Sequence, residues 1–247
     1  MISSVWHVVV YQPLYNTLAF LIGIFPGHSV GLAIITLTVI VRLALFPLTG
    51  KSMKAQKVMK ELEPELKRIR EKHKEDKQLQ AKKTMELYQE RGVTPFSGCL
   101  PLFIQIPIII GLYLVFKDLK EINMQHLYSF VLNPGTLDMH FLIFDLAGKS
   151  MLLAATAGFA QYIQTDLSLG RQPAPVSDAS GKKSFQEDFQ KSMQLQMRYV
   201  LPVMISFIAF KTSSAVALYW TTSNILSIVQ ELLIRRSMKR EKEQKSA

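Results

Sequence analysis

Residues 30–48 read VGLAIITLTVIVRLALFPL, and this stretch decides the fold class because its only charged residue is Arg42. A helix needs about 20 predominantly apolar residues to cross the hydrocarbon core of a bilayer. With two flanking residues the stretch reaches that length, so we predict a transmembrane helix over residues 30–50. The chain is therefore expected to be an integral membrane protein.

The composition agrees with a membrane protein that has separate apolar and charged segments. Of its 247 residues, 49% are apolar and 19% are charged, and the net charge is +10. In a soluble protein this charge would indicate nucleic acid binding, whereas in a membrane protein it indicates basic loops on the cytoplasmic side. The single cysteine, Cys99, excludes an intrachain disulfide.

Four further segments have the composition of transmembrane helices, at residues 93–117, 150–167, 192–210 and 215–234. The third of them contains Arg198, which lies near one end and can extend its head group to the interface. We therefore predict an all-α integral membrane protein with five transmembrane helices.

The N-terminal segment, residues 1–29, allows two interpretations. Its apolar pattern is interrupted by polar residues and a proline: His7, Gln12, Pro13 and Asn16. This pattern favours an amphipathic interfacial helix on the extracellular side. A further transmembrane helix over residues 5–25 is the alternative.

Residues 51–92 form a charged insert between the first two predicted transmembrane helices. Thirteen Lys or Arg and eight Asp or Glu lie within residues 51–91. Apolar residues recur at helical spacing on both sides of the polar run at residues 73–77: Val58, Leu62, Leu66, Ile69, Met85 and Tyr88. Pro64 is expected to break or restart a helix. We predict a cytoplasmic antiparallel helical hairpin, with a solvated loop as the alternative.

The distribution of basic residues predicts the orientation of the chain. The hairpin and the tail, residues 235–247, are basic, whereas residues 1–29 contain no Lys or Arg. Because basic loops stay in the cytoplasm, we expect the hairpin, the loop at 168–191 and the tail inside. The loop and interfacial segment at 118–149 are then outside, as is the N-terminus, and the C-terminus is cytoplasmic.

Arg42 is the residue that bears most directly on function, because it lies well inside an otherwise uncharged helix. An arginine at the helix centre costs about 2.5–3.5 kcal/mol on insertion scales, so it must face water, a partner or the bundle interior. One interpretation is a positive site in a wet cavity open to the cytoplasm. The alternative is a structural arginine that reaches toward the interface or pairs with Glu231.

Other predicted helices carry polar residues for the same cavity. The last helix has Trp220, Ser223, Asn224, Ser227 and Glu231 on one face. The second has Gln105, and the third has Gln161 and Gln164 beside the small residues Ala154, Ala157 and Gly158. Each of them alone also fits interhelical hydrogen bonding or close packing. Together they predict a client-binding hydrophilic groove formed by Arg42, Gln105, Gln161, Trp220, Asn224 and Ser227.

Enzyme motifs are absent from the sequence, which contains no HExxH, GxSxG, P-loop or GxGxxG pattern. The five histidines are scattered, and no pair of acids lies at membrane depth. We therefore expect a protein that is not an enzyme and needs no cofactor or metal.

Three motifs resemble, in the same order, those of the YidC membrane protein insertases. PFSGCLPLFIQIPI at residues 95–108 resembles the signature of the family's second core helix, and FLIFDL at 141–146 resembles the aromatic motif before the third. ALYWTTSNILSIVQ at 217–230 is similar to the last helix, and Arg42 occupies the place of the groove arginine. The resemblance covers nearly the whole chain, and without a large periplasmic domain the chain looks like a Gram-positive member.

The resemblance implies an insertase and chaperone of the bacterial plasma membrane, with a groove closed on the outside. It implies that Arg42 meets acidic residues of client segments. The implied partners are nascent membrane proteins, the lipid bilayer and the ribosome, contacted by the basic tail and hairpin; the Sec translocon is a further candidate. The turn at residues 211–215, KTSSA, departs from the family's Pro-Ala-Gly element, so the resemblance does not predict its geometry.

Two other functions fit parts of the sequence. A transporter or channel for small anions would use Arg42 as its binding charge, but the chain has no internal repeat of the kind common in transporters. A scaffold that docks a ribosome or another acidic partner through the hairpin and tail would not require Arg42.

Overall fold

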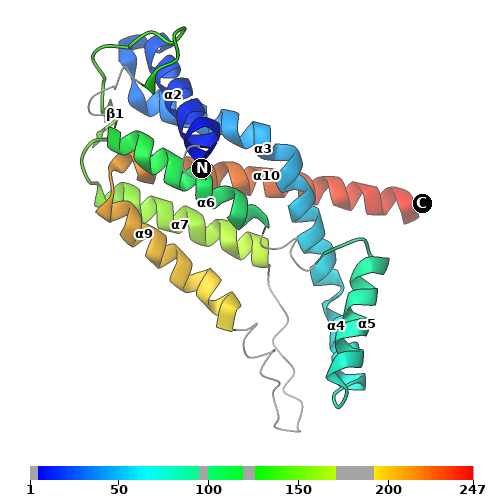
Figure 1. Cartoon of the computed structure of the whole chain (residues 1–247). Helices are drawn as coiled ribbons and strands as arrows, with labels where there is room; N and C mark the ends of the chain where they lie inside the picture. Colours follow the sequence, from blue (N-terminus) through cyan, green and yellow to red (C-terminus); the bar gives the residue numbers. More distant parts are fainter. Residues whose placement is uncertain (1–4, 95–99, 119–125, 171–191, 247) are drawn as a thin grey trace. The chain divides into compact units, whose positions relative to one another are not determined.

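The computed structural model describes residues 5–94, 100–118, 126–170 and 192–246 (Figure 1). Residues 95–99 of the PFSGCLPLFIQIPI motif and residues 171–191 of the predicted cytoplasmic loop lie outside the described residues. The elements, in chain order, are η1 (His7–Tyr11), α2 (Gln12–Ile24), η2 (Pro26–His28), α3 (Val30–Glu61), α4 (Glu63–Lys72), α5 (Lys77–Glu90), α6 (Leu100–Asp118), β1 (His140–Phe141), β2 (Phe144–Asp145), α7 (Met151–Leu169), η5 (Gln196–Val200), α9 (Leu201–Lys211) and α10 (Ser214–Ser246).

The described chain is mostly helical, in agreement with the predicted class. Three of its helical segments are long and apolar enough to cross a membrane, namely His7–Ile24, Val30–Glu61 and Ser192–Lys211, and a shorter apolar helix covers Gln105–Lys117. The first of these has the length for a span, so both interpretations of the N-terminal segment stay open. α7 and α10 are not among the candidates because polar residues lower their hydropathy, and five spans remain a prediction.

The chain divides into two compact units. The first consists of Met1–Ala44 and Ile108–Gln230, and the second of Leu45–Pro107 and Glu231–Ala247. α3, α6 and α10 each supply residues to both units. α3 passes through Pro47 and continues to Glu61, so the first predicted transmembrane helix and the start of the charged insert form one helix.

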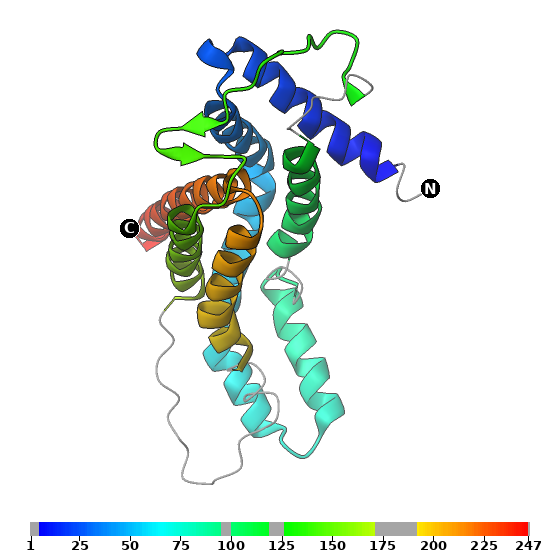
Figure 2. The same cartoon turned by 90° about the vertical axis from the view of Figure 1, so that its left-hand side faces the viewer.

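In the first unit, α7 and α9 lie side by side (Figure 2). Gly158 of α7 permits this approach, since a Cβ atom there would lie 1.8 Å from Ser206 Oγ and 2.8 Å from the carbonyl oxygen of Pro202. Small residues at helix contacts are typical of membrane bundles, where close packing drives association. Arg198 forms an ion pair with Asp166 of α7, with Nε and Oδ1 3.2 Å apart, and the position of its head group at the interface stays a prediction.

Hydrogen bonds join α2 and α3 to the segment between α6 and α7. The buried Asn16 side chain donates to the carbonyl oxygen of His126 at 2.9 Å and accepts from the amide of Tyr128 at 2.6 Å. The amide of Val30 donates to the carbonyl oxygen of Asp138 at 3.1 Å. These bonds fix this connecting segment to α2 and to the beginning of α3.

The same segment contains β1 and β2, a two-stranded antiparallel pair (Figure 2). Phe141 of β1 lies against Gly31 of α3, where a Cβ atom would be 2.3 Å from the phenyl ring. Leu146, which follows β2, is almost completely buried in the apolar core of the unit. The end of the unit at which α3 begins is therefore packed with apolar side chains.

The turn between α9 and α10 is also held by this segment. The amide of Ser214 donates to the carbonyl oxygen of Gly148 at 2.8 Å, and the amide of Ala215 donates to that of Leu146 at 3.1 Å. The first amides of a helix have no partner within the helix, so these two bonds cap α10. This explains how the KTSSA turn is fixed although it lacks the Pro-Ala-Gly element.

In the second unit, α4 and α5 pack against each other. Their contact is a small apolar cluster around Leu62, Leu66, Leu87 and Val93. Arg91 forms an ion pair with Glu65 at 3.0 Å near the open end, and Gln80 donates to the carbonyl oxygen of Arg70 at 3.3 Å nearer the turn. These two pairings run in opposite directions along the chain, so the helices are antiparallel.

Local sequence signals determine where the helices of this pair begin. Pro64 lies in the first turn of α4, where its missing amide removes no hydrogen bond. Asp76 caps α5, because its carboxylate accepts from the amides of Gln78 and Leu79 at 3.0 and 2.9 Å. On the exposed face of α5, the hydrogen bond from the Lys83 ammonium lowers the pKa of the Glu86 carboxyl.

Candidate functional site

The side chain of Arg42 is held between α3 and α10 of the first unit. Its Nε donates to Ser223 Oγ at 3.0 Å, and its Nη2 donates to the same oxygen. Ser223 is 1% exposed, whereas Arg42 is half-buried. A fixed hydroxyl therefore orients the guanidinium, and the remaining N–H groups are left for other partners.

The hydroxyl of Ser223 is neutral, so it does not compensate the charge of Arg42. Within the described part of the first unit, no ion pair includes Arg42. Glu231, which the sequence offers as a partner, forms an ion pair with Arg235 one turn later in α10, at 2.8 Å. Arg42 thus keeps its positive charge within the apolar part of its unit.

Asn224 and Ser227 of α10 are both buried. Asn224 Nδ2 donates to the carbonyl oxygen of Ala157 in α7 over a long distance of 3.5 Å. Ser227 Oγ donates to the carbonyl oxygen of Ser223 at 2.9 Å, one turn earlier in the same helix. These polar groups form bonds within and between helices, which was the alternative to a role in a groove.

Gln161 lies at the beginning of a line of polar side chains along α7. Its Nε2 donates to Thr165 Oγ1 at 3.0 Å and to Gln164 Oε1 at 3.3 Å. Gln164 in turn donates to Ser168 Oγ at 3.0 Å. Hydrogen bonds spaced by three or four residues let amide side chains satisfy one another along one helix.

Trp220 and Gln105 have different surroundings from the other predicted groove residues. Trp220 is 8% exposed and belongs to the apolar core of the first unit. Gln105 is half-buried and belongs to the second unit. The groove formed by all six residues therefore remains a prediction, and what the structure brings together is Arg42 with the polar face of α10.

Ser223 is the residue that sequence reasoning did not include in the groove. It lies on the predicted polar face of the last helix, but its role depends on Arg42 of α3, which is 181 residues away in sequence. Among the described residues there is no group of three His, Cys, Asp or Glu that would hold a metal ion.

The structure defines a helical integral membrane protein with an arginine held between two of its helices. Its sequence matches the family described as 60Kd inner membrane protein over residues 21–243. It is 33% identical to the membrane protein insertase YidC of Oceanobacillus iheyensis over 241 residues, which are 96% of this chain and 86% of the relative.

Longer relatives show the same similarity over part of their length. The chain is 35% identical over 206 residues to the membrane protein insertases YidC of Francisella philomiragia and of Francisella tularensis subsp. novicida. The match covers 83% of this chain and 32% of each relative, so the chain corresponds to about a third of their length. The chain belongs to the YidC family, as its motifs predicted, and is a protein of the bacterial inner membrane.

Proposed function

We propose that this protein is an insertase and chaperone that draws polar or acidic segments of client proteins into a hydrophilic groove and releases their apolar helices into the bilayer. The proposal extends to this chain the activity that the names of its relatives state. The groove consists of Arg42, Gln105, Gln161, Trp220, Asn224 and Ser227. The protein performs no covalent chemistry and uses no cofactor.

The depth of Arg42 is the observation that carries this proposal. Arg42 follows Val30, the first residue of α3, by 12 positions. At a rise of 1.5 Å per residue this is roughly 18 Å along the helix, which is more than half of a hydrocarbon core of about 30 Å. With Val30 on the outer side, a client segment held at Arg42 has roughly 18 Å of hydrocarbon still to cross, instead of the about 30 Å of the whole core.

The charge of Arg42 selects the segments that enter. Two opposite charges 4 Å apart attract each other by about 4 kcal/mol at an effective dielectric constant of 20, and by about 1 kcal/mol in water. Because Ser223 orients the guanidinium without neutralising it, the attraction acts on an acidic client residue. Burial of the client's apolar helix in lipid then drives release of the segment.

The proposed orientation places the N-terminus outside and the C-terminus in the cytoplasm, with five core transmembrane helices. The packing of Phe141 against Gly31 then closes the outer end, which supports a groove that is open only to the cytoplasm and to lipid. The α4–α5 hairpin and the basic tail lie inside, where they can contact a ribosome. Nascent membrane proteins are the clients, and the Sec translocon is a candidate partner.

Proteoliposomes that contain the full chain test the proposal. The client has one transmembrane helix and an acidic N-terminal segment, whose translocation is followed by protease protection. We expect Arg42→Ala to reduce translocation about tenfold, which corresponds to a loss of roughly 1.4 kcal/mol. Arg42→Lys keeps the charge and serves as the matched control, which we expect to retain most of the activity.

A second client with a neutral N-terminal segment separates attraction by charge from a structural role of Arg42. If both clients lose activity equally in Arg42→Ala, the arginine does not act through its charge on the client. If liposomes containing the protein translocate no client but conduct anions, the chain is a transporter and the proposal is wrong.

A further inference from the structure

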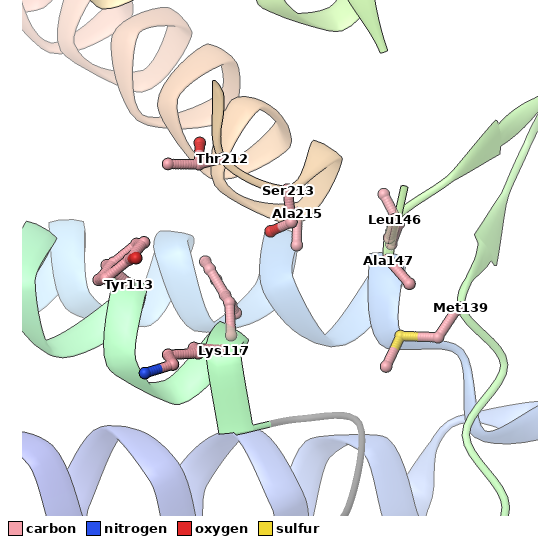
Figure 3. A pocket seen from close by; sticks show the side chains of 9 residues that line it. Tyr113, Lys117, Met139, Leu146, Ala147, Thr212, Ser213 and Ala215 are labelled. Carbon is pink, nitrogen blue, oxygen red and sulfur yellow. The ribbon is translucent and has the colours of Figure 1, made fainter. Parts of the chain in front are cut away.

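A pocket of about 270 Å³ lies in the first unit, where three segments of the chain meet (Figure 3). The end of α6 contributes Tyr113, Phe116 and Lys117, and the turn between α9 and α10 contributes Thr212, Ser213 and Ala215. The segment around β1 and β2 contributes Met139, Leu146 and Ala147. The pocket is distinct from the Arg42 site, because none of the predicted groove residues lines it.

The polar groups of the pocket are suited to an anion. Within the described part of the first unit, the Lys117 ammonium forms no ion pair, and the hydroxyls of Tyr113 and Ser213 form no hydrogen bond. The Thr212 hydroxyl is already used, since it bonds to carbonyl oxygens of α9. One cation and two hydroxyl donors from two different segments are therefore available, and phosphate oxygens are acceptors for donors of this kind.

The position of the pocket indicates where the phosphate comes from. The apolar part of α6 ends at Lys117, and α9 ends at Lys211, whose ammonium lies 5.5 Å from the centre of the Phe207 ring. Lysines at the ends of apolar helices mark the level of the lipid head groups. On the hydrocarbon side of this level, Ile110 of α6 and Phe207 of α9 have exposed fractions of 48% and 60%.

We propose that this pocket binds the phosphate of an anionic phospholipid, with the acyl chains lying along the exposed apolar faces of α6 and α9. Phe116, Leu146 and Ala215, which are buried, line its apolar part. An anionic lipid is preferred over a zwitterionic one because its head group adds no positive charge beside Lys117. With the orientation given under the proposed function, the lipid belongs to the outer leaflet.

Native mass spectrometry of the full chain in detergent, with phosphatidylglycerol added in steps, tests this site. We expect Lys117→Gln to weaken the tightest phosphatidylglycerol adduct about tenfold. Lys149→Gln is the matched control, because Lys149 is exposed, belongs to the same unit and does not line the pocket. We expect this variant to bind as the wild type does, and we expect phosphatidylcholine to bind more weakly than phosphatidylglycerol to the wild type and to Lys149→Gln.

Four results would overturn the proposal: equal binding by all three proteins, equal losses in both variants, complete displacement of the lipid by millimolar inorganic phosphate, or its displacement by an acidic peptide. The first two mean that Lys117 has no special role, and the third means that the pocket binds free phosphate. Displacement by an acidic peptide at a similar concentration would assign the pocket to a client segment instead. No client is needed to observe the lipid, so failure here is separate from failure of the insertase proposal.

Discussion

The contact between α7 and α9 gives the sharpest prediction, because it depends on the absence of one methyl group. In Gly158→Ala the new Cβ atom would lie 1.8 Å from Ser206 Oγ and 2.8 Å from the carbonyl oxygen of Pro202. The serine hydroxyl can rotate away, but the carbonyl oxygen belongs to the backbone of α9. An ordinary contact needs about 3.5 Å, so α9 has to retreat by roughly 0.7 Å.

The expected cost follows from this retreat. A gap of about 0.5–1 Å removes a quarter to a half of the dispersion attraction at a contact, and overpacking of this kind costs about 1–3 kcal/mol. Unfolding by SDS in mixed micelles, followed by circular dichroism, measures the loss. Gly23→Ala is the control, because its Cβ would meet only Pro134 Cβ, at 3.9 Å.

A double substitution separates the two clashes. Ser206→Ala removes the oxygen at 1.8 Å but leaves the Pro202 carbonyl oxygen at 2.8 Å, so it should restore part of the stability lost in Gly158→Ala. If Gly158→Ala unfolds at the same SDS fraction as Gly23→Ala, the close packing of α7 on α9 is wrong. Full recovery in the double variant would show that the Pro202 carbonyl is not a constraint.

Two further predictions concern the contacts of α2 and α3 with the segment between α6 and α7. Gly31→Ala places a Cβ atom 2.3 Å from the Phe141 ring, so we expect the free energy of unfolding to fall by about 1–3 kcal/mol in the same SDS assay. Phe141→Leu removes the ring and should reduce that loss. Additive effects of the two substitutions would contradict the contact. Asn16→Ala leaves the Tyr128 amide and the His126 carbonyl without their side-chain partner. We therefore expect the free energy of unfolding to fall by about 1–3 kcal/mol and hydrogen exchange at the Tyr128 amide to become faster. Unchanged exchange would show that this bond is absent.

Much of the helical architecture was predictable from local patterns. Long apolar stretches predicted membrane helices, because the thickness of the hydrocarbon core determines how many apolar residues are needed. The apolar residues of the charged insert predicted two helices, and in the structure Leu62 and Leu66 pack against Leu87. Pro64 correctly marked the start of a new helix, because proline is tolerated in the first turn.

The bounds of the helices were less predictable. The first predicted transmembrane helix ended at residue 50, whereas α3 continues to Glu61. Hydrophobicity marks where a helix can leave the hydrocarbon, but it does not mark where the helix ends, because the backbone hydrogen bonds continue into water. Gly50 lies at this boundary, but α3 continues through it, and Lys51 and Ser52 do not interrupt the helix.

The sequence by itself determined the family and the helical class, and it predicted a functional role for Arg42, since a charge inside an apolar helix is conspicuous without any structure. Only the tertiary structure decided that Ser223 holds the guanidinium, that Trp220 belongs to the apolar core, and that Lys117 faces a pocket with the α9–α10 turn. Periodicity along a helix identifies which residues share a face. The partner of that face is set by how helices distant in sequence pack, and this depends on the shapes of many side chains together.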